Sequence, residues 1–180
     1  MMETDIQTIC KIKTQPKEIA NFLKVSLKEW LASGEDEKDY DDIIIPFRKT
    51  EDSAGYDIFY NSSKDILLAP GESVIINTGI RSFIEAPWFL SIFPRSGLGF
   101  KYHLSLANTA GIIDGDYFYS DNEGHIKVKI VNRGNKCFEL KKGTSFCQGI
   151  FMQYGITYND DDTLKLTRNG GFGSTDEKRI

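Results

Sequence analysis

The sequence is poor in cysteine and histidine, with three Cys and two His among 180 residues. Cys10, Cys137 and Cys147 are odd in number and lack CxxC spacing, which argues against a disulfide framework and against a zinc site. We expect all three to be buried thiols. His103 and His125 each lack a second imidazole at ligand spacing, so we expect surface or turn residues rather than metal ligands or a catalytic base.

Clusters of basic residues and long apolar runs are also missing. The formal net charge is −4 and no Lys/Arg run occurs, which argues against binding duplex nucleic acid, because that needs a basic face. No apolar run approaches the length of a membrane span, and the first ten residues carry acids without an apolar signal region. We therefore expect a soluble, unsecreted protein that binds neither nucleic acid nor membranes, located in the cytoplasm, or in the nucleus or host cell if the source is eukaryotic or viral.

With 40% hydrophobic residues, the chain can bury one core, and we expect a single domain over residues 1–180. From about residue 56 onward, turn residues such as Ala69-Pro70-Gly71 separate short β-rich runs, namely YDIFY, DILLA, SVIINTGIRSFI, WFLSIF, HIKVKIVN, CFEL and FCQGIFMQY. The run from His125 to Asn132 places three aliphatic residues on one face and two lysines on the other, as a half-buried strand does. Many short strands without alternating helices predict an all-β sandwich, barrel or jelly roll.

The first 43 residues have a different pattern. After an expected strand near Ile6 to Ile12, Pro16 opens a segment whose apolar residues recur at intervals of three and four, namely Ile19, Phe22, Leu23, Leu27, Trp30 and Leu31. This spacing predicts an amphipathic helix ending near Ser33-Gly34. Its Trp30 and Leu31 either pad the outside of the barrel or bind a protein partner. The acidic stretch GEDEKDYDD lacks the glycine and glutamate positions of a calcium loop, so we expect a solvated linker.

The stretch PRSG, Pro94 to Gly97, follows an apolar strand and precedes residues that can begin a short helix or turn. A guanidinium, a hydroxyl and free backbone N–H groups at such a boundary form a cradle for phosphate oxygens. A tight turn with a surface arginine is the alternative interpretation.

Two carboxylates stand at i and i+2 in GIIDGDY, Gly111 to Tyr117. On an extended segment Asp114 and Asp116 point to the same side, so one can be a base and the other an orienting partner. An Asp-Gly turn with a packed tyrosine is equally compatible.

The glycine-rich GGFGST, Gly170 to Thr175, has little reason to be ordered alone and is suited to close over a ligand.

The order of five motifs resembles the trimeric dUTPase family over about residues 44–175. These motifs are SAGYD (53–57), PRSGLG (94–99), NTAGIIDGDY (108–117), KKGTSFCQGIF (141–151) and RNGGFGST (168–175). The resemblance implies a distorted jelly roll or barrel, a homotrimer with shared active sites, and a flexible C-terminal arm over 168–180. It also implies hydrolysis of dUTP to dUMP and pyrophosphate, which limits uracil in DNA and supplies dUMP for thymidylate synthesis. Mg²⁺ is implied as the cofactor, held through substrate phosphates and waters rather than directly by protein side chains.

The resemblance also implies roles for individual residues. The phosphates would be bound by Arg95, Ser96, Gly97, Gln148, Arg168, Gly173, Ser174 and Thr175. The uracil and deoxyribose would be bound by Asn108, Gly111, Ile113, Tyr117 and Phe172, with the tyrosine under the sugar and the phenylalanine stacked on the base. Asp114 would be the general base, Asp57 a supporting carboxylate tied to an arginine, and Asp116 a second supporting carboxylate.

Three features depart from the family pattern. The residues Phe118 to Glu123 form an insertion beyond the sugar-facing tyrosine, expected as an outward loop or as a change at the mouth of the site. The arm is one residue shorter between Arg168 and Phe172, and residues 16–43 form an insertion before the first motif. Two other functions stay open at this point. A dCTP deaminase would need a glutamate on the strand IKVKIVN, which has no acid, and a non-hydrolysing regulatory protein would keep the pocket alone.

Overall fold

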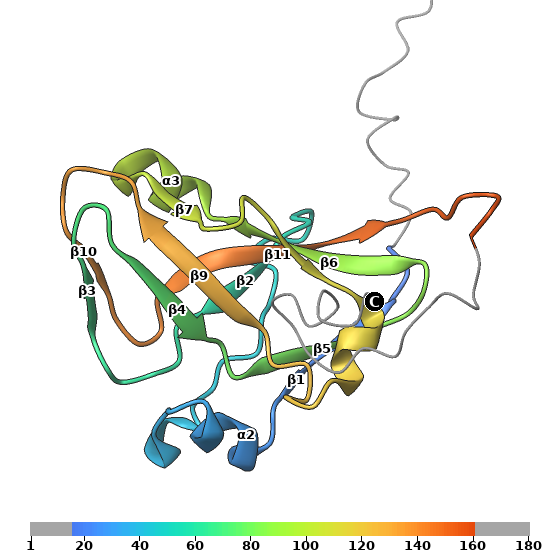
Figure 1. Cartoon of the computed structure of the whole chain (residues 1–180), viewed down its shortest axis with the longest axis horizontal. Helices are drawn as coiled ribbons and strands as arrows, with labels where there is room; N and C mark the ends of the chain where they lie inside the picture. The colour runs from blue at the N-terminus through green and yellow to red at the C-terminus, as the bar shows by residue number, and fades with distance from the viewer. Residues whose placement is uncertain (1–15, 161–180) are drawn as a thin grey trace, which may run out of the picture.

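Short antiparallel strands dominate the computed structural model, which describes residues 16–160 (Figure 1). The strands are β1 (Ala20–Lys24), β2 (Tyr56–Phe59), β3 (Ile66–Leu68), β4 (Ser73–Asn77), β5 (Ile80–Ile84), β6 (Trp88–Pro94), β7 (Leu104–Leu106), β8 (Gly111–Ile113), β9 (Lys127–Asn132), β10 (Phe138–Leu140) and β11 (Ser145–Gln153). The helical elements are α2 (Leu27–Ala32), α3 (Ser96–Tyr102) and the 3₁₀ turns η1 (Glu37–Asp39) and η2 (Gly115–Tyr119).

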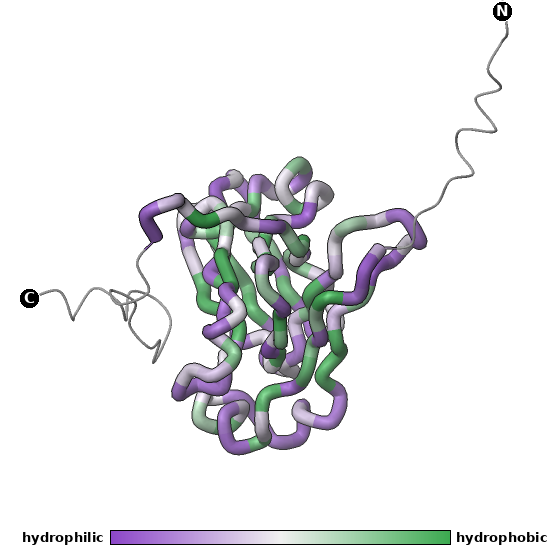
Figure 2. Tube along the Cα trace, turned by 90° about the vertical axis from the view of Figure 1, so that its right-hand side faces the viewer, coloured by the Kyte–Doolittle hydropathy of each residue, from purple (hydrophilic) through white to green (hydrophobic). Residues whose placement is uncertain are grey.

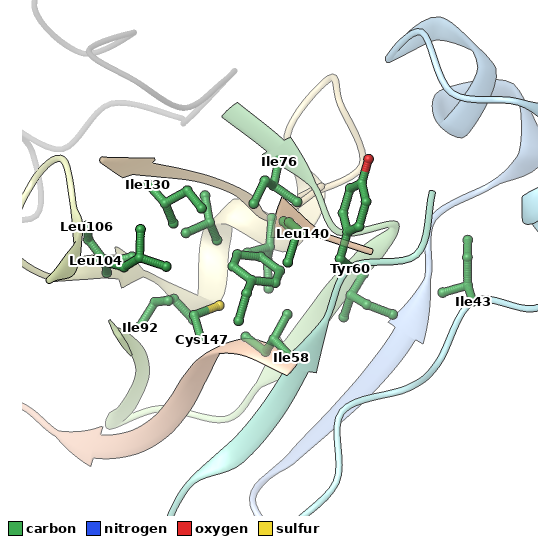
Figure 3. Packing of buried hydrophobic residues seen from close by; sticks show 14 of the residues in the cluster. Ile43, Ile58, Tyr60, Ile76, Ile92, Leu104, Leu106, Ile130, Leu140 and Cys147 are labelled. Atoms are coloured by element: carbon green, nitrogen blue, oxygen red, sulfur yellow. The ribbon is translucent and has the colours of Figure 1, made fainter. Parts of the chain in front are cut away.

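The strands form a four-stranded sheet β2-β11-β6-β8, a three-stranded sheet β4-β9-β7, and the pairs β1-β5 and β3-β10. The core lies between them: in Figure 3, Ile58 and Cys147 of the larger sheet face Ile76 and Ile130 of the smaller one. Figure 2 shows apolar residues along the strand centres and hydrophilic residues in the loops. The predicted all-β, jelly-roll-like fold is thus confirmed.

Strand β9 follows the predicted alternation. Ile126, just before it, and Val128 and Ile130 within it are each at most 5% exposed, while Lys129 is exposed. Burying each of these aliphatic side chains contributes about 1.5–3 kcal/mol. This strand therefore joins the core on one face only.

The prediction of one helix over residues 16–33 is wrong. Residues Ala20–Lys24 form strand β1, which pairs antiparallel with β5 from Ala20 opposite Ile84 to Lys24 opposite Ile80. The helix α2 begins only after Ser26, whose hydroxyl accepts a hydrogen bond from the Glu29 backbone N–H at 3.2 Å. A short apolar run fits the period of a helix and that of a strand, and pairing with the free edge of β5 favours the strand.

Trp30 does not pad the outside of the barrel. Its side chain is fully buried in the core, and its indole N–H donates to the Asp36 carbonyl at 2.9 Å. Gly79 makes room for it, because a Cβ at that position would lie 3.1 Å from the Trp30 ring. Leu31, the next residue of the helix, is 44% exposed.

The acidic stretch after α2 is not a solvated linker. Asp39 is 1% exposed and accepts hydrogen bonds from the Ser63 backbone N–H and the Lys142 ammonium, each at 2.8 Å. Burial alone would raise the pKa of Asp39, but these two donors outweigh it and lower the pKa. Lys142 also bonds to Asp42 at 2.9 Å, which ties this stretch to the turn before β11.

The cysteines and histidines are only partly as expected. Cys147 is buried, but Cys137 is exposed in the turn before β10, and Cys10 lies outside the described residues. His103 is an exposed turn residue with φ +54° at the end of α3. His125, in contrast, is fully buried, so the expected surface position is wrong. The expected strand near residues 6–12 also lies outside the described part. Within residues 16–160, no helix has the length and apolar character needed to span a membrane.

Candidate active site

The PRSG turn lies where β6 ends and α3 begins. Gln148 of β11 stands opposite Asp57 of β2 on one side and Phe93 of β6 on the other. Because side chains alternate along a strand, Arg95 lies on the same face as Phe93. The fold therefore places Asp57, Gln148 and Arg95 on one face of the four-stranded sheet.

One ion pair and one hydrogen bond hold the Arg95 guanidinium in this cluster. Its Nε lies 3.2 Å from Asp57 Oδ1, and its Nη1 donates to the Ser145 carbonyl at 3.3 Å. The second oxygen of Asp57 lies 2.9 Å from the ammonium of Lys49. The Asp57 side chain is 9% exposed, so its charge is screened little by water. The expected pairing of Asp57 with an arginine is present, whereas Lys49 was not foreseen.

Gly55 of the SAGYD motif leaves room for the Gln148 amide. A Cβ built at Gly55 would lie 2.4 Å from Gln148 Oε1, closer than a real contact allows. The amide Nε2 donates to the Pro94 carbonyl at 3.3 Å. The glycine thus fixes where this amide can lie, directly beside the PRSG turn.

The strands β7 and β8 flank a tight connection at residues 107–110, in which Thr109 has φ +66°. A pocket of about 220 Å³ opens beside it. Three of the predicted base-binding residues share this pocket with residues of β6, β7 and β9, and its lining consists of Ile92, Leu106, Ala107, Asn108, Gly111, Ile113, Lys127, Val128 and Lys129.

Asp114 follows β8 with extended backbone angles, φ −80° and ψ 158°. It therefore shares a face with Ile112, which stands opposite Ser91, and this is the sheet face that carries Arg95. Together with Phe89 and Tyr154, Asp114 and Ile112 line a separate depression of about 250 Å³.

Asp114 and Arg95 lie far apart within one chain. Ile113 pairs with Leu90, so Asp114 stands at the level of Phe89, six residues before Arg95 on the same extended segment. At about 3.3 Å per residue, this is roughly 20 Å. The two side chains of one chain therefore lie too far apart to contact each other.

The expectation that Asp116 points to the same side as Asp114 on an extended segment is wrong. The chain turns into η2 at Gly115, so Asp116 does not continue the extended segment and lies exposed. Tyr117 is 6% exposed, and its hydroxyl donates to the His125 carbonyl at 2.9 Å. The alternative of a turn with a packed tyrosine thus describes the local geometry.

The arm residues Arg168, Phe172, Gly173, Ser174 and Thr175 lie outside the described residues. In the part of the chain from 16 to 160, no three His, Cys, Asp or Glu side chains are grouped to hold a metal ion. Lys49 is the residue that sequence reasoning missed at the cluster. A lone lysine in a loop carries no pattern, and only the fold brings it to Asp57.

Comparison with known proteins gives consistent matches. The family model for dUTPase matches residues 41–176. The chain is 40% identical over 134 residues to the deoxyuridine 5'-triphosphate nucleotidohydrolase of Lactococcus lactis, covering 74% of this chain and 88% of that protein. It is 38% identical over 143 residues to the protein of that name from Escherichia phage T5, covering 74% and 93%. A crystal structure of dUTPase from Streptococcus mutans matches with a TM-score of 0.62 and 28% identity, covering 76% and 98%.

Proposed function

The chain belongs to the dUTPase family and is a hydrolase of dUTP, and from that premise we propose which of its residues perform the reaction. The observation that carries the proposal is the common sheet face of Asp57, Gln148, Arg95 and Asp114. At one end of this face lie the Arg95 guanidinium and the Gln148 amide, and at the other end lies the Asp114 carboxylate. Hydrolysis of a triphosphate needs such groups.

The phosphate chain binds at the PRSG turn. Asp57 and the Ser145 carbonyl hold Nε and Nη1 of Arg95, and the third guanidinium nitrogen donates to phosphate oxygens. The backbone N–H groups of Ser96 and Gly97 and the Ser96 hydroxyl add further donors. A Cβ at Gly97 would meet nothing within 4 Å, which fits an open side for the ligand. Gln148 donates its amide near the α-phosphate.

Uracil enters the pocket at the connection of β7 and β8, where Asn108, Gly111 and Ile113 surround it. Backbone groups of this hairpin pair with the uracil edge, and cytosine is rejected because it would leave buried donors or acceptors unpaired. Tyr117 lies under the deoxyribose and takes the space that a 2′-hydroxyl would need. Phe172 of the arm stacks on the base.

Asp114 acts as the general base that draws a proton from the attacking water, which then displaces pyrophosphate from the α-phosphorus. Asp116 supports this carboxylate from the following turn. Bound Mg²⁺ would be held through the phosphate oxygens and waters rather than by side chains of this chain, and it would supply neutralisation of the phosphate charge. The arm then closes, and Arg168, Gly173, Ser174 and Thr175 contact the terminal phosphates and exclude bulk water.

The protein works as a homotrimer with shared sites. The separation of roughly 20 Å between Arg95 and Asp114 in one chain supports this, since each site then takes the phosphate-binding Arg95 and the base Asp114 from different subunits. The depression beside Asp114 is bordered by exposed apolar side chains, and such patches mark interfaces: Ile112 is 54%, Met152 43% and Tyr154 48% exposed. The arm comes from the third subunit.

The test is pyrophosphate release from dUTP, with and without Mg²⁺, by the intact chain and by Asp114→Asn, with dCTP, dTTP and UTP as controls. Asp114→Asn should lose about 10²–10⁴ in turnover while dUTP still binds. Ammonia release from dCTP would instead indicate the deaminase. Tight binding of dUTP by the intact chain without turnover would indicate the regulatory protein.

A further inference from the structure

Two segments that the family resemblance leaves unassigned lie against each other. They are helix α2, from the 16–43 insertion, and the 118–124 loop, and in Figure 1 both flank the β1-β5 pair. The backbone N–H and the hydroxyl of Ser26 both donate to the Glu123 carboxylate, at 2.8 and 2.6 Å. The loop is therefore not the outward loop that the sequence suggested, because it folds back onto the helix.

Strand β5 holds the same loop from the other side. Arg81 donates to the Phe118 carbonyl at 2.7 Å and lies 3.7 Å above the Phe118 ring. Its Nη1 lies 3.7 Å from Glu123 Oε2. Partial burial would raise the pKa of Glu123, but the two bonds from Ser26 and the charge of Arg81 outweigh it and keep the carboxylate ionised at neutral pH.

The buried His125 connects the helix to Tyr117. Its Nε2 accepts from the Gly79 backbone N–H at 2.9 Å, so the proton lies on Nδ1, which is 3.0 Å from Glu29 Oε1. The His125 carbonyl accepts the Tyr117 hydroxyl at 2.9 Å, and Asn122 donates to that same hydroxyl at 2.8 Å. The tyrosine hydroxyl is thus fixed both as a donor and as an acceptor.

The end of the loop also presses on the backbone of Tyr117. Glu123 and Gly124 both have left-handed backbone angles, φ +58° and +71°. A Cβ at Gly124 would lie 2.6 Å from the Tyr117 carbonyl oxygen, so only glycine fits this close return of the chain. The loop end therefore packs closely against the backbone of Tyr117.

Glu29 links the helix to the base pocket as well. Its Oε1 lies 3.8 Å from the ammonium of Lys127, and Lys127 lines the 220 Å³ pocket. One helix of the insertion is thus linked through His125 to the residue proposed under the sugar, and through Lys127 to the wall of the pocket proposed for the base.

We propose that α2 and the 118–124 loop form a brace that positions Tyr117, and that this brace sets how strictly the protein prefers dUTP over UTP. Its side chains are Ser26 and Glu29 at α2, Asn122 and Glu123 of the loop, and Arg81 and His125, which bind to these two segments. The inference rests on the proposed place of Tyr117 under the deoxyribose. The Tyr117 ring excludes a 2′-hydroxyl only if it keeps its position when the nucleotide binds. The hydrogen bonds of the brace hold it in that position. Glu123 and Asn122 are in this account positioning residues, since they act through the tyrosine.

The test compares kcat/KM for dUTP and UTP in Glu123→Ala. We expect the preference for dUTP to fall about 10-fold, because the loosened ring admits the extra hydroxyl, while kcat for dUTP stays within about threefold. Glu123→Gln keeps an acceptor for Ser26 and should retain most of the preference. Glu72→Ala is the matched control: its carboxylate accepts the Ala69 backbone N–H at 2.8 Å in a turn outside the brace, so the preference should not change.

Asn122→Ala replaces Glu123→Ala if that variant does not fold. It removes the bond to the Tyr117 hydroxyl and the bond that Asn122 accepts from the Gly124 backbone N–H, and it leaves the Glu123 carboxylate in place. Affinities for non-hydrolysable α,β-imido analogues of dUTP and UTP give the same ratio without turnover. An unchanged ratio in a folded variant would overturn the brace, and so would an equal loss for both nucleotides, which a purely structural role predicts. Failure of the wild-type protein to hydrolyse dUTP would refute the proposed function instead, while the binding ratio would still test the brace.

Discussion

Replacing Gly55 by alanine should lower the activity of the protein up to about 100-fold without unfolding it. The new Cβ would lie 2.4 Å from Gln148 Oε1, whereas ordinary contacts begin at 3.4 Å. The amide must therefore move by roughly 1 Å, which in a group that positions a substrate costs up to about 10² in kcat/KM, or about 2.7 kcal/mol. The atom that has to yield is the end of a flexible side chain, so the fold can keep its backbone in place.

The assay pairs dUTP hydrolysis with urea denaturation. Gly55→Ala should unfold at the same urea concentration as wild type or slightly higher, because alanine restricts the unfolded chain by about 0.4–1 kcal/mol. Gly155→Ala, where the added methyl meets nothing within 4 Å, is the control and should keep full activity. In a double variant with Gln148→Ala, the two losses should not add. Full activity in Gly55→Ala, or a large loss of stability, would refute the reasoning.

Three further outcomes are expected. Asp57→Asn removes the ion pair that holds Arg95, so KM for dUTP should rise about 10-fold in a folded protein, measured by steady-state kinetics. Burial lowers the pKa of His125, although its bond to Glu29 acts in the opposite direction. The unfolded chain therefore binds more protons than the folded one, and the free energy of unfolding should fall as pH decreases below about 6.5. Urea denaturation from pH 8 to 5.5 measures this change. Lys142→Met leaves the buried Asp39 without its cation and should cost about 1–3 kcal/mol of stability, at the lower end because the lysine is 31% exposed.

Two of these predictions have a control variant. Lys141→Met removes an exposed ion pair with Glu139 and should leave the urea midpoint unchanged. His125→Gln should flatten the pH dependence of stability, and a slope equal to wild type would show that another group causes it. A KM that is unchanged in Asp57→Asn would mean that Arg95 does not need this anchor.

Features encoded by local patterns were predictable from the sequence. The alternation around Val128 gave the half-buried strand, and Arg95 stands at a strand end as PRSG suggested. The order of five short motifs indicated the family, although each motif alone was ambiguous.

Features decided by distant partners were not predictable. Residues 20–24 fit a helical period, but the open edge of β5, some 60 residues later, makes them a strand. His125 stands alone in the sequence, yet it meets Glu29, 96 residues away. Lys49 reaches Asp57 only because the loop between them folds back. Such contacts depend on tertiary packing, which overrides local propensity.

Mixing two inactive variants tests the central claim most directly, namely that Asp114 and Arg95 of one chain serve different active sites. Asp114→Asn and Arg95→Ala are each expected to be inactive as pure proteins, and they are unfolded together in equal amounts and refolded. If each site takes Arg95 and Asp114 from different subunits, about one site in four receives both intact groups. Random trimers should then regain about a quarter of wild-type dUTP hydrolysis. If both groups served the same site from one chain, every site would carry a defect, and a mixture without activity would contradict the account.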